Sequence, residues 1–170
     1  MTRSLLVALA TVLAACGPGG GAEAPASFDE ADVPPAAVLD ASALGAWLPA
    51  EVTGLGRVGV VDSTDAALGA EVTRAVARYG PGPNVRLAVA DLGSADMAEM
   101  MGYGWGLEGR AAELVGGHPA QAGGGVAGRP YTHRALVAGR FLVEAESGDA
   151  ALAEAAVTAV DLDGLARAGR

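Results

Sequence analysis

The chain has 170 residues, a formal net charge of −9 and no lysine, and its single cysteine is Cys16. Binding to nucleic acid and electrostatic adhesion to anionic lipid both need a basic surface, so this composition argues against both. The absence of lysine excludes Schiff-base enzymes, Ser-Lys hydrolases and the lysine-bearing phosphate loop.

The N-terminal residues have the pattern of an export signal. One positive charge, Arg3, precedes an apolar run over residues 5–15, and this run is too short to span a bilayer. The run ends in Leu13-Ala14-Ala15-Cys16, which resembles, position by position, the lipobox of bacterial lipoproteins. A lone cysteine has no partner for an internal disulfide, and lipidation would also remove an exposed free thiol from an oxidising compartment.

This resemblance implies an address and an attachment. Residues 1–15 would be the cleaved signal peptide, and the acylated Cys16 would be the mature N-terminus. Two or more acyl chains anchor a protein stably, so we expect a lipid anchor in the bacterial cell membrane or outer membrane, with the domain facing the periplasm or the exterior. Acylation of the only thiol excludes thiol catalysis and Cys-ligated zinc. Residues 16–41, rich in Gly, Pro, Ala and acidic residues, are predicted to be a flexible linker.

The first half of the domain contains one strong structural signal. A helical turn is predicted within residues 42–54, a short strand over 54–61 and a polar loop over 62–69. Two alternating runs then flank a Gly-Pro-Gly-Pro-Asn turn, which predicts a hairpin over 71–93. A short helix follows with Ser94 as its N-cap.

The second half repeats this order. Residues 106–128 are glycine-rich and match no element, whereas residues 129–147 predict a hairpin that turns at Ala138-Gly139. A helix is expected over 149–169, with Asp149 as its N-cap. Residues 42–170 are therefore predicted to form one small α+β domain, with an antiparallel sheet built from two hairpins and with helices packed on one face.

The first hairpin predicts a cluster of arginines. Matching apolar residues across the turn gives the pairs Tyr79–Val85, Ala77–Leu87 and Ala75–Val89. The other face then carries Arg74, Arg78 and Arg86, with Arg78 directly opposite Arg86, and like charges opposite each other are destabilising. These arginines are either neutralised by the domain's own carboxylates or bind an anionic ligand or partner.

Two other groups of residues are weaker candidates for chemistry. Met97, Met100 and Met101 are spaced for one helix face, where they would fill the core or, with His118, bind Cu(I). A two-residue turn at Ala138-Gly139 would place His133 opposite Glu144, as a surface pair or as a base with its orienting carboxylate.

A third candidate lies in the predicted polar loop. Its run Asp62-Ser63-Thr64-Asp65 offers oxygen atoms to calcium but lacks the glycine and the distal glutamate of an EF-hand.

The sequence favours a binding or structural module of the cell envelope over an enzyme. No catalytic residue, cofactor or metal site is assigned, because the titratable candidates are scattered singly along the chain. The expected partners are the membrane, through Cys16, and an envelope protein or an anionic ligand, with no nucleic acid. A small hydrolase-like envelope enzyme and a copper-binding lipoprotein remain the alternatives.

Overall fold

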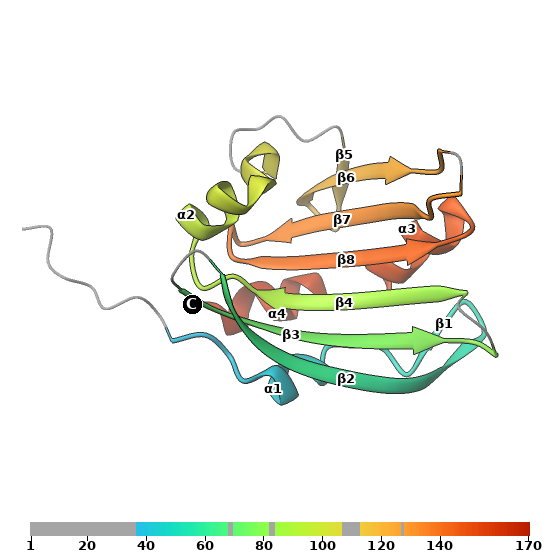
Figure 1. The fold of residues 1–170 in the computed structure, drawn as a ribbon, viewed down its shortest axis with the longest axis horizontal. Helices are drawn as coiled ribbons and strands as arrows, with labels where there is room; N and C mark the ends of the chain where they lie inside the picture. Colours follow the sequence, from blue (N-terminus) through green and yellow to red (C-terminus); the bar gives the residue numbers. More distant parts are fainter. Residues whose placement is uncertain (1–36, 68–69, 82–83, 107–112, 127) are drawn as a thin grey trace, which may run out of the picture. The chain divides into compact units, whose positions relative to one another are not determined.

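A computed structural model describes residues 37–170, except 68–69, 82–83, 107–112 and 127. An eight-stranded antiparallel sheet forms its centre and curls along the order β1-β2-β3-β4-β8-β7-β6-β5 (Figure 1). The strands are β1 Glu51–Val52, β2 Leu55–Ala67, β3 Ala70–Tyr79, β4 Val85–Asp91, β5 Glu113–Val115, β6 His118–Gly124, β7 Tyr131–Val137 and β8 Phe141–Ser147. The helices are α1 Ala41–Gly45, α2 Ala95–Ala98, α3 Ala150–Thr158 and α4 Leu162–Ala168, with irregular helical turns η1 Glu99–Tyr103 and η2 Gly104–Gly106. The predicted combination of an antiparallel sheet with helices is confirmed, in a larger sheet than two hairpins provide.

The two faces of the sheet carry different residues because successive side chains of a strand point to opposite sides. Odd-numbered residues of β3, β4, β7 and β8 form the covered face, where Tyr79, Leu87, Phe141 and Val143 are fully buried. Helices α1, α3 and α4 pack on this face through Leu44, Val157 and Leu165, among others, and Figure 1 shows α3 and α4 behind the sheet. The main hydrophobic core lies between the sheet and these helices.

Even-numbered residues of the same strands form the opposite face, which we call the cleft face. Among the described elements, α2, η1 and η2 cover one end of it. Met97 and Ala98 of α2 are buried there against Ala90, Leu136 and Leu142. The prediction that the helices share one face is therefore wrong: these even-numbered residues are apolar as well, so this end of the cleft face also needs a cover.

Polar side chains cap the N-termini of the helices at the two predicted positions, Ser94 and Asp149, and at a third, Asp161. The hydroxyl of Ser94 accepts a hydrogen bond from the N–H of Met97 at 3.1 Å, and the carboxylate of Asp149 caps α3. The predicted C-terminal helix is two helices, because the Asp161 carboxylate accepts the N–H of Gly164 at 2.9 Å and begins α4.

The register predicted for the first hairpin is confirmed. Strands β3 and β4 pair with Tyr79 opposite Val85, and Arg78 lies opposite Arg86. Because the odd-numbered residues are apolar along both strands, a shift by one residue would expose this whole set to solvent.

The second hairpin differs from its prediction by one residue. Ala138 and Gly139 both have positive φ and form the expected turn, which is closed by a hydrogen bond from the N–H of Arg140 to the carbonyl of Val137 at 3.0 Å. Arg140, however, is an extra residue outside the ladder, so Val137 pairs with Phe141. Extra residues of this kind are β-bulges, and they shift the register of everything beyond them.

Strands also occupy segments for which the sequence predicts no strand. The predicted polar loop 62–69 is wrong over residues 62–67, because β2 continues through this segment and pairs with β3. Part of the glycine-rich segment 106–128 forms β5 and β6. Neither segment shows a clear alternation of apolar and polar residues. In β2 most residues are exposed, so no buried face imposes that alternation.

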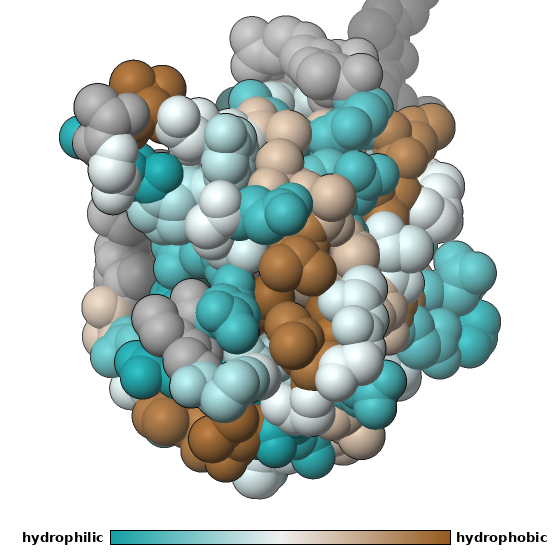
Figure 2. Space-filling view, turned by 90° about the vertical axis from the view of Figure 1, so that its right-hand side faces the viewer, coloured by the Kyte–Doolittle hydropathy of each residue, from teal (hydrophilic) through white to brown (hydrophobic). Residues whose placement is uncertain are grey.

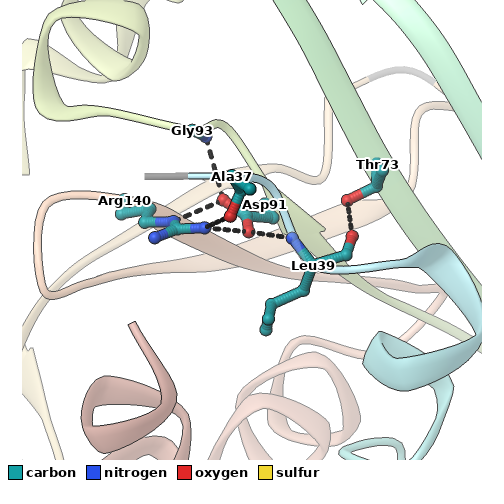
Figure 3. Close-up of polar contacts among 6 residues, drawn as sticks. All are labelled: Ala37, Leu39, Thr73, Asp91, Gly93 and Arg140. Atoms are coloured by element: carbon teal, nitrogen blue, oxygen red, sulfur yellow. Dashed lines mark hydrogen bonds and ion pairs between the residues drawn. The ribbon is translucent and has the colours of Figure 1, made fainter. Parts of the chain in front are cut away.

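The folded chain begins before residue 42, within the predicted linker. The buried carboxylate of Asp91 accepts the N–H of Leu39 at 2.8 Å, and the Thr73 hydroxyl donates to the carbonyl of Leu39 at 2.6 Å. Arg140 donates to the carbonyl of Ala37 at 2.8 Å and to Asp91 (Figure 3). Residues 37–41 therefore belong to the domain.

Candidate functional site

The uncovered part of the cleft face contains a depression of about 580 Å³. Strand β2 contributes Val58, Gly59, Val60, Val61, Ser63 and Asp65, β3 contributes Arg74, Val76 and Arg78, and β4 contributes Arg86. We call this depression the arginine cleft. It combines three arginines and Asp65 with the exposed side chains of Val58 and Val61, which we call the valine wall, so the three arginines singled out from the sequence do share one surface.

Two of the three arginines are held by acidic residues of β8. Arg74 Nη2 lies 3.2 Å from Glu144 Oε1, and Arg86 Nη1 lies 3.1 Å from Glu146 Oε2. Glu144 also accepts a hydrogen bond from Arg134 of β7. These contacts follow from the register, because β8 lies next to β4 and places Glu146 opposite Arg86. The predicted neutralisation by the domain's own carboxylates therefore applies to Arg74 and Arg86.

Arg78 differs from its two neighbours. Its side chain is exposed, and among the described residues no carboxylate lies within ion-pair distance of it. It stands directly opposite Arg86 in the ladder, and like charges at such positions destabilise a strand pair; Glu146 offsets the charge of Arg86, which leaves that of Arg78. Of the three cleft arginines, Arg78 is the one that no described carboxylate pairs with, so it is open to a ligand.

The inner end of the arginine cleft has an unmet hydrogen-bond donor. Arg74 Nε is buried and has no hydrogen-bond partner among the described residues. Tyr103 of η1 lies near this end. Burial raises the pKa of its phenol, the negative charge of Glu144 raises it further, and Arg134 and Arg74 oppose these effects. Glu144 pairs with both Arg74 and Arg134, and Asp65 lines the same cleft, so the feature of this end that a ligand can use is the buried Arg74 Nε–H, which has no partner among the described residues.

The depression continues past the two opposed arginines. A second hollow of about 300 Å³ shares Arg78 and Arg86 with the first and reaches Pro130 and Glu146. The two arginines therefore lie midway along one groove on this face.

Exposed apolar residues concentrate beside the cleft. Val58 is 70% exposed and Val61 is 71% exposed, with Val60 at 39% between them. The other exposed large apolar residues of the described ranges are Met100, Leu114, Val126 and Tyr131, which are separated along the chain. Figure 2 shows hydrophobic and hydrophilic residues interspersed at one end of the domain. Val60 stands opposite Ala77 of the covered face, and its Cγ1 lies near Gly45 of α1, so the valines whose exposed side chains belong to the cleft are Val58 and Val61. Two large, strongly exposed apolar residues beside one depression differ from the single apolar residues that are scattered over a soluble surface.

The methionines and His118 do not come together. Met97 is buried with 3% exposure, whereas Met100 is 60% exposed, and Met101 packs only in part against the cleft-face cluster. His118 lies on the covered side, where its Nε2 is 3.4 Å from Asp163 Oδ1 of α4. The sheet separates the two groups, and full packing of all three methionines in the core is also wrong, because only Met97 is buried.

His133 and Glu144 lie on opposite faces of the sheet. The extra residue Arg140 shifts the register, so Arg134 rather than His133 stands opposite Glu144. His133 is buried, and its Nε2 has no hydrogen-bond partner among the described residues and lies 3.6 Å from Glu113 Oε1. The predicted pairing of His133 with Glu144 is wrong in both its surface and its catalytic form.

The predicted calcium ligands Asp62-Ser63-Thr64-Asp65 lie within β2. Alternate residues of a strand point to opposite faces, so their oxygens cannot surround one ion. In the part of the chain that the structure describes, no three His, Cys, Asp or Glu side chains are grouped to hold a metal. Cys16, the predicted lipidation site, lies outside the described residues. Within the described ranges, no helix has the length and apolar composition to cross a membrane.

Comparison with protein-family models, curated proteins and solved structures finds no match. The candidate site therefore rests on geometry alone. Its valine wall is not evident from the sequence, because residues 58–61 by themselves indicate only a short strand with no known partner. The signal that reveals it is the continuation of that strand through Asp62, which places Gly59 and Val61 beside Arg78 and Val76.

Proposed function

We propose that this chain is an exported lipoprotein, tethered to a bacterial envelope membrane through an acylated Cys16, and that its domain binds an anionic ligand with an apolar portion in the arginine cleft. The observation that carries the binding function is Arg78, an exposed cation without an ion-pair partner among the described residues, between Arg86 and a wall of valines.

The ion pairs of the neighbouring arginines support this function. Glu144 and Glu146 hold the side chains of Arg74 and Arg86 in place, so little side-chain entropy remains to be lost on binding. The glutamates neutralise Arg74 and Arg86, so Arg78 supplies the positive charge for an anionic ligand. A guanidinium presents forked N–H donors that match a carboxylate or phosphate.

The valines determine the rest of the ligand. Val58 and Val61 are exposed in the same depression as Arg78, and covering them removes apolar surface from water at about 25 cal/mol per Å². A bare inorganic anion would leave this surface wet. The arrangement suits an anion that carries an apolar chain or an apolar neighbour.

The binding function is tested with octanoate, with acetate as the anion that lacks an apolar chain. Calorimetric titration of the domain is expected to show octanoate binding, which Arg78→Gln weakens by about tenfold or more, the effect of one charge-assisted hydrogen bond. Arg167→Gln, at an exposed position of α4, is the matched control and should leave the affinity unchanged. Equal affinities of octanoate for the Arg78 variant and the unaltered domain would reject the site.

The anchor is tested separately in cells. The unaltered chain should incorporate labelled palmitate and sediment with membranes, and Cys16→Ser should lose both properties. A Cys16→Ser variant that remains membrane-bound and is cleaved at the same position would contradict the anchor without affecting the binding site.

A further inference from the structure

Strand β2 has one open edge. Its first two residues pair with β1, and residues 57–67 pair with β3 on the other side. In the described part of the chain, no strand lies against the outer edge of residues 58–67. An unpaired edge presents a row of free N–H and C=O groups, which is a template for an added strand.

The usual protections of an edge strand are weak here. Natural edges carry charged side chains, lysine above all, or proline or a covering element; residues 58–67 contain no lysine or proline, and their charged residues are Asp62 and Asp65. Residues 58–62 are exposed throughout, and a register irregularity lies only at the beginning of the segment, between Arg57 and Gly59. Val58 and Val61 are more than two-thirds exposed, so the strand offers apolar contacts as well as hydrogen bonds.

Gly59 connects this edge to the arginine cleft. It stands directly opposite Arg78, between that residue and the open edge. A Cβ atom at Gly59 would meet no other atom within 4 Å, so the space over this residue is open. Neighbouring strands lie about 4.8 Å apart, and an arginine side chain is long enough to cross one strand that has no side chain of its own.

We infer that the open edge of β2 binds an extended segment of a partner polypeptide as an added strand, with an acidic residue opposite Gly59 and an apolar residue opposite Val61. This inference rests on the proposed function, because the carboxylate of the partner is the anion that reaches Arg78. Main-chain hydrogen bonds to residues 58–67 provide affinity, and the two side-chain positions on the cleft face provide specificity.

The pattern of charge argues against a second copy of this chain as the partner. A symmetric antiparallel pair of β2 strands that places Asp65 opposite Gly59 also places Asp62 opposite Asp62 of the other copy. Like charges directly opposite each other destabilise a pair of strands. A different polypeptide with an isolated acidic residue between apolar ones avoids this repulsion.

The experiment uses a capped peptide, Thr-Val-Thr-Glu-Thr-Val-Thr, and the same peptide with Gln in place of Glu. The Glu peptide is expected to bind the domain at least about tenfold more tightly than the Gln peptide, a difference that Arg78→Gln abolishes. Gly59→Val should weaken the Glu peptide because its side chain separates Arg78 from the edge. Gly56→Val is the matched control, since Gly56 pairs with β1 and its Cβ also meets nothing within 4 Å; thermal melts check that both variants fold.

Backbone methylation distinguishes strand addition from simple anion binding. Two methylated versions of the Glu peptide are compared, one with N-methyl groups on its odd-numbered residues and one with them on its even-numbered residues. In an added strand, only the odd or only the even N–H groups face β2. One methylated peptide should lose at least about tenfold in affinity, and the other should keep it. If both bind like the unmodified peptide, the added strand is rejected while octanoate binding, and with it the proposed function, still stands. A dimer in sedimentation that Gly59→Val disrupts would overturn the choice of partner.

Discussion

The guanidinium of Arg140 and the carboxylate of Asp91 meet inside the domain through two hydrogen bonds, Nε to Oδ1 at 2.7 Å and Nη2 to Oδ2 at 2.6 Å. The hydrogen bonding that Arg140 donates to Asp91 raises the pKa of Arg140, and the charge of Asp91 acts in the same direction against the effect of burial. The same carboxylate accepts the N–H groups of Leu39 and Gly93. One ion pair therefore joins the β7–β8 turn, the end of β4 and the first described residues (Figure 3).

Asp91→Asn is expected to lower the free energy of unfolding by about 3–5 kcal/mol, because it leaves the Arg140 charge buried without a counter-charge. Asp62→Asn is the control, since this exposed residue of β2 should change stability by less than about 0.5 kcal/mol. Urea unfolding of the domain followed by circular dichroism measures both. Equal stability of the two variants would show that the ion pair is dispensable.

The sequence predicts the first hairpin down to its register, and the reason is visible in its residues. Odd positions from Ala75 to Tyr79 and from Val85 to Val89 are all apolar, and even positions include three arginines, so only one register buries the first set. The same alternation is sufficient to place Arg74, Arg78 and Arg86 together on the opposite surface, where the structure has them.

The remainder of the site depends on contacts between distant segments. Glu144 and Glu146 reach Arg74 and Arg86 only because β8 inserts next to β4, and the second register depends on the single unpaired residue Arg140. The Ala138-Gly139 signal predicts a turn but does not predict that Arg140 stays unpaired. Arg140 lies outside the ladder and forms an ion pair with Asp91, which is distant in the sequence. The valine wall escapes prediction because an exposed edge strand lacks the alternation that marks a half-buried one.

Alkaline pH should destabilise the domain through Tyr79, and Tyr103, whose pKa burial also raises, acts in the same direction. Burial raises the pKa of the Tyr79 phenol to about 12, and Arg57 opposes this only in part. The fold favours the neutral phenol, so its contribution to stability is complete below a pH of about 10, the pKa of an unfolded tyrosine, and is lost as the pH rises towards the folded pKa of about 12. The free energy of unfolding should therefore fall across this window.

The variant Tyr79→Phe tests this assignment. It loses the hydrogen bond from the phenol to the carbonyl of Pro49, 2.9 Å long, and should cost about 1 kcal/mol at neutral pH. The decline at high pH should become shallower in this variant and remain unchanged in Tyr131→Phe, since Tyr131 is 39% exposed. Unfolding curves that decline equally steeply in all three proteins would assign the alkaline transition to other groups.

Replacing Met97 and Met100 with alanine should change the free energy of unfolding by different amounts. Met97→Ala is expected to cost about 2–5 kcal/mol, because its buried side chain packs against the cleft-face cluster. Met100→Ala should change the free energy of unfolding by less than about 0.5 kcal/mol, because the side chain is 60% exposed. Thermal and urea unfolding of both variants gives the comparison, and a larger cost at Met100 than at Met97 would contradict this assignment of the buried and exposed methionines.

Gly164 in α4 should tolerate no side chain, although alanine usually favours a helix over glycine by about 1 kcal/mol. A Cβ atom there would overlap the Asp161 carboxylate and lie 2.6 Å from Trp47 Cζ3. Because Asp161 caps α4 by accepting the N–H of Gly164, the added methyl group would force the cap to rotate away. Gly164→Ala is therefore expected to destabilise the domain by about 1–3 kcal/mol. Gly148→Ala, where a Cβ meets nothing within 4 Å, should be close to neutral, and a stabilised Gly164→Ala variant in urea unfolding would show that helix propensity outweighs the cap.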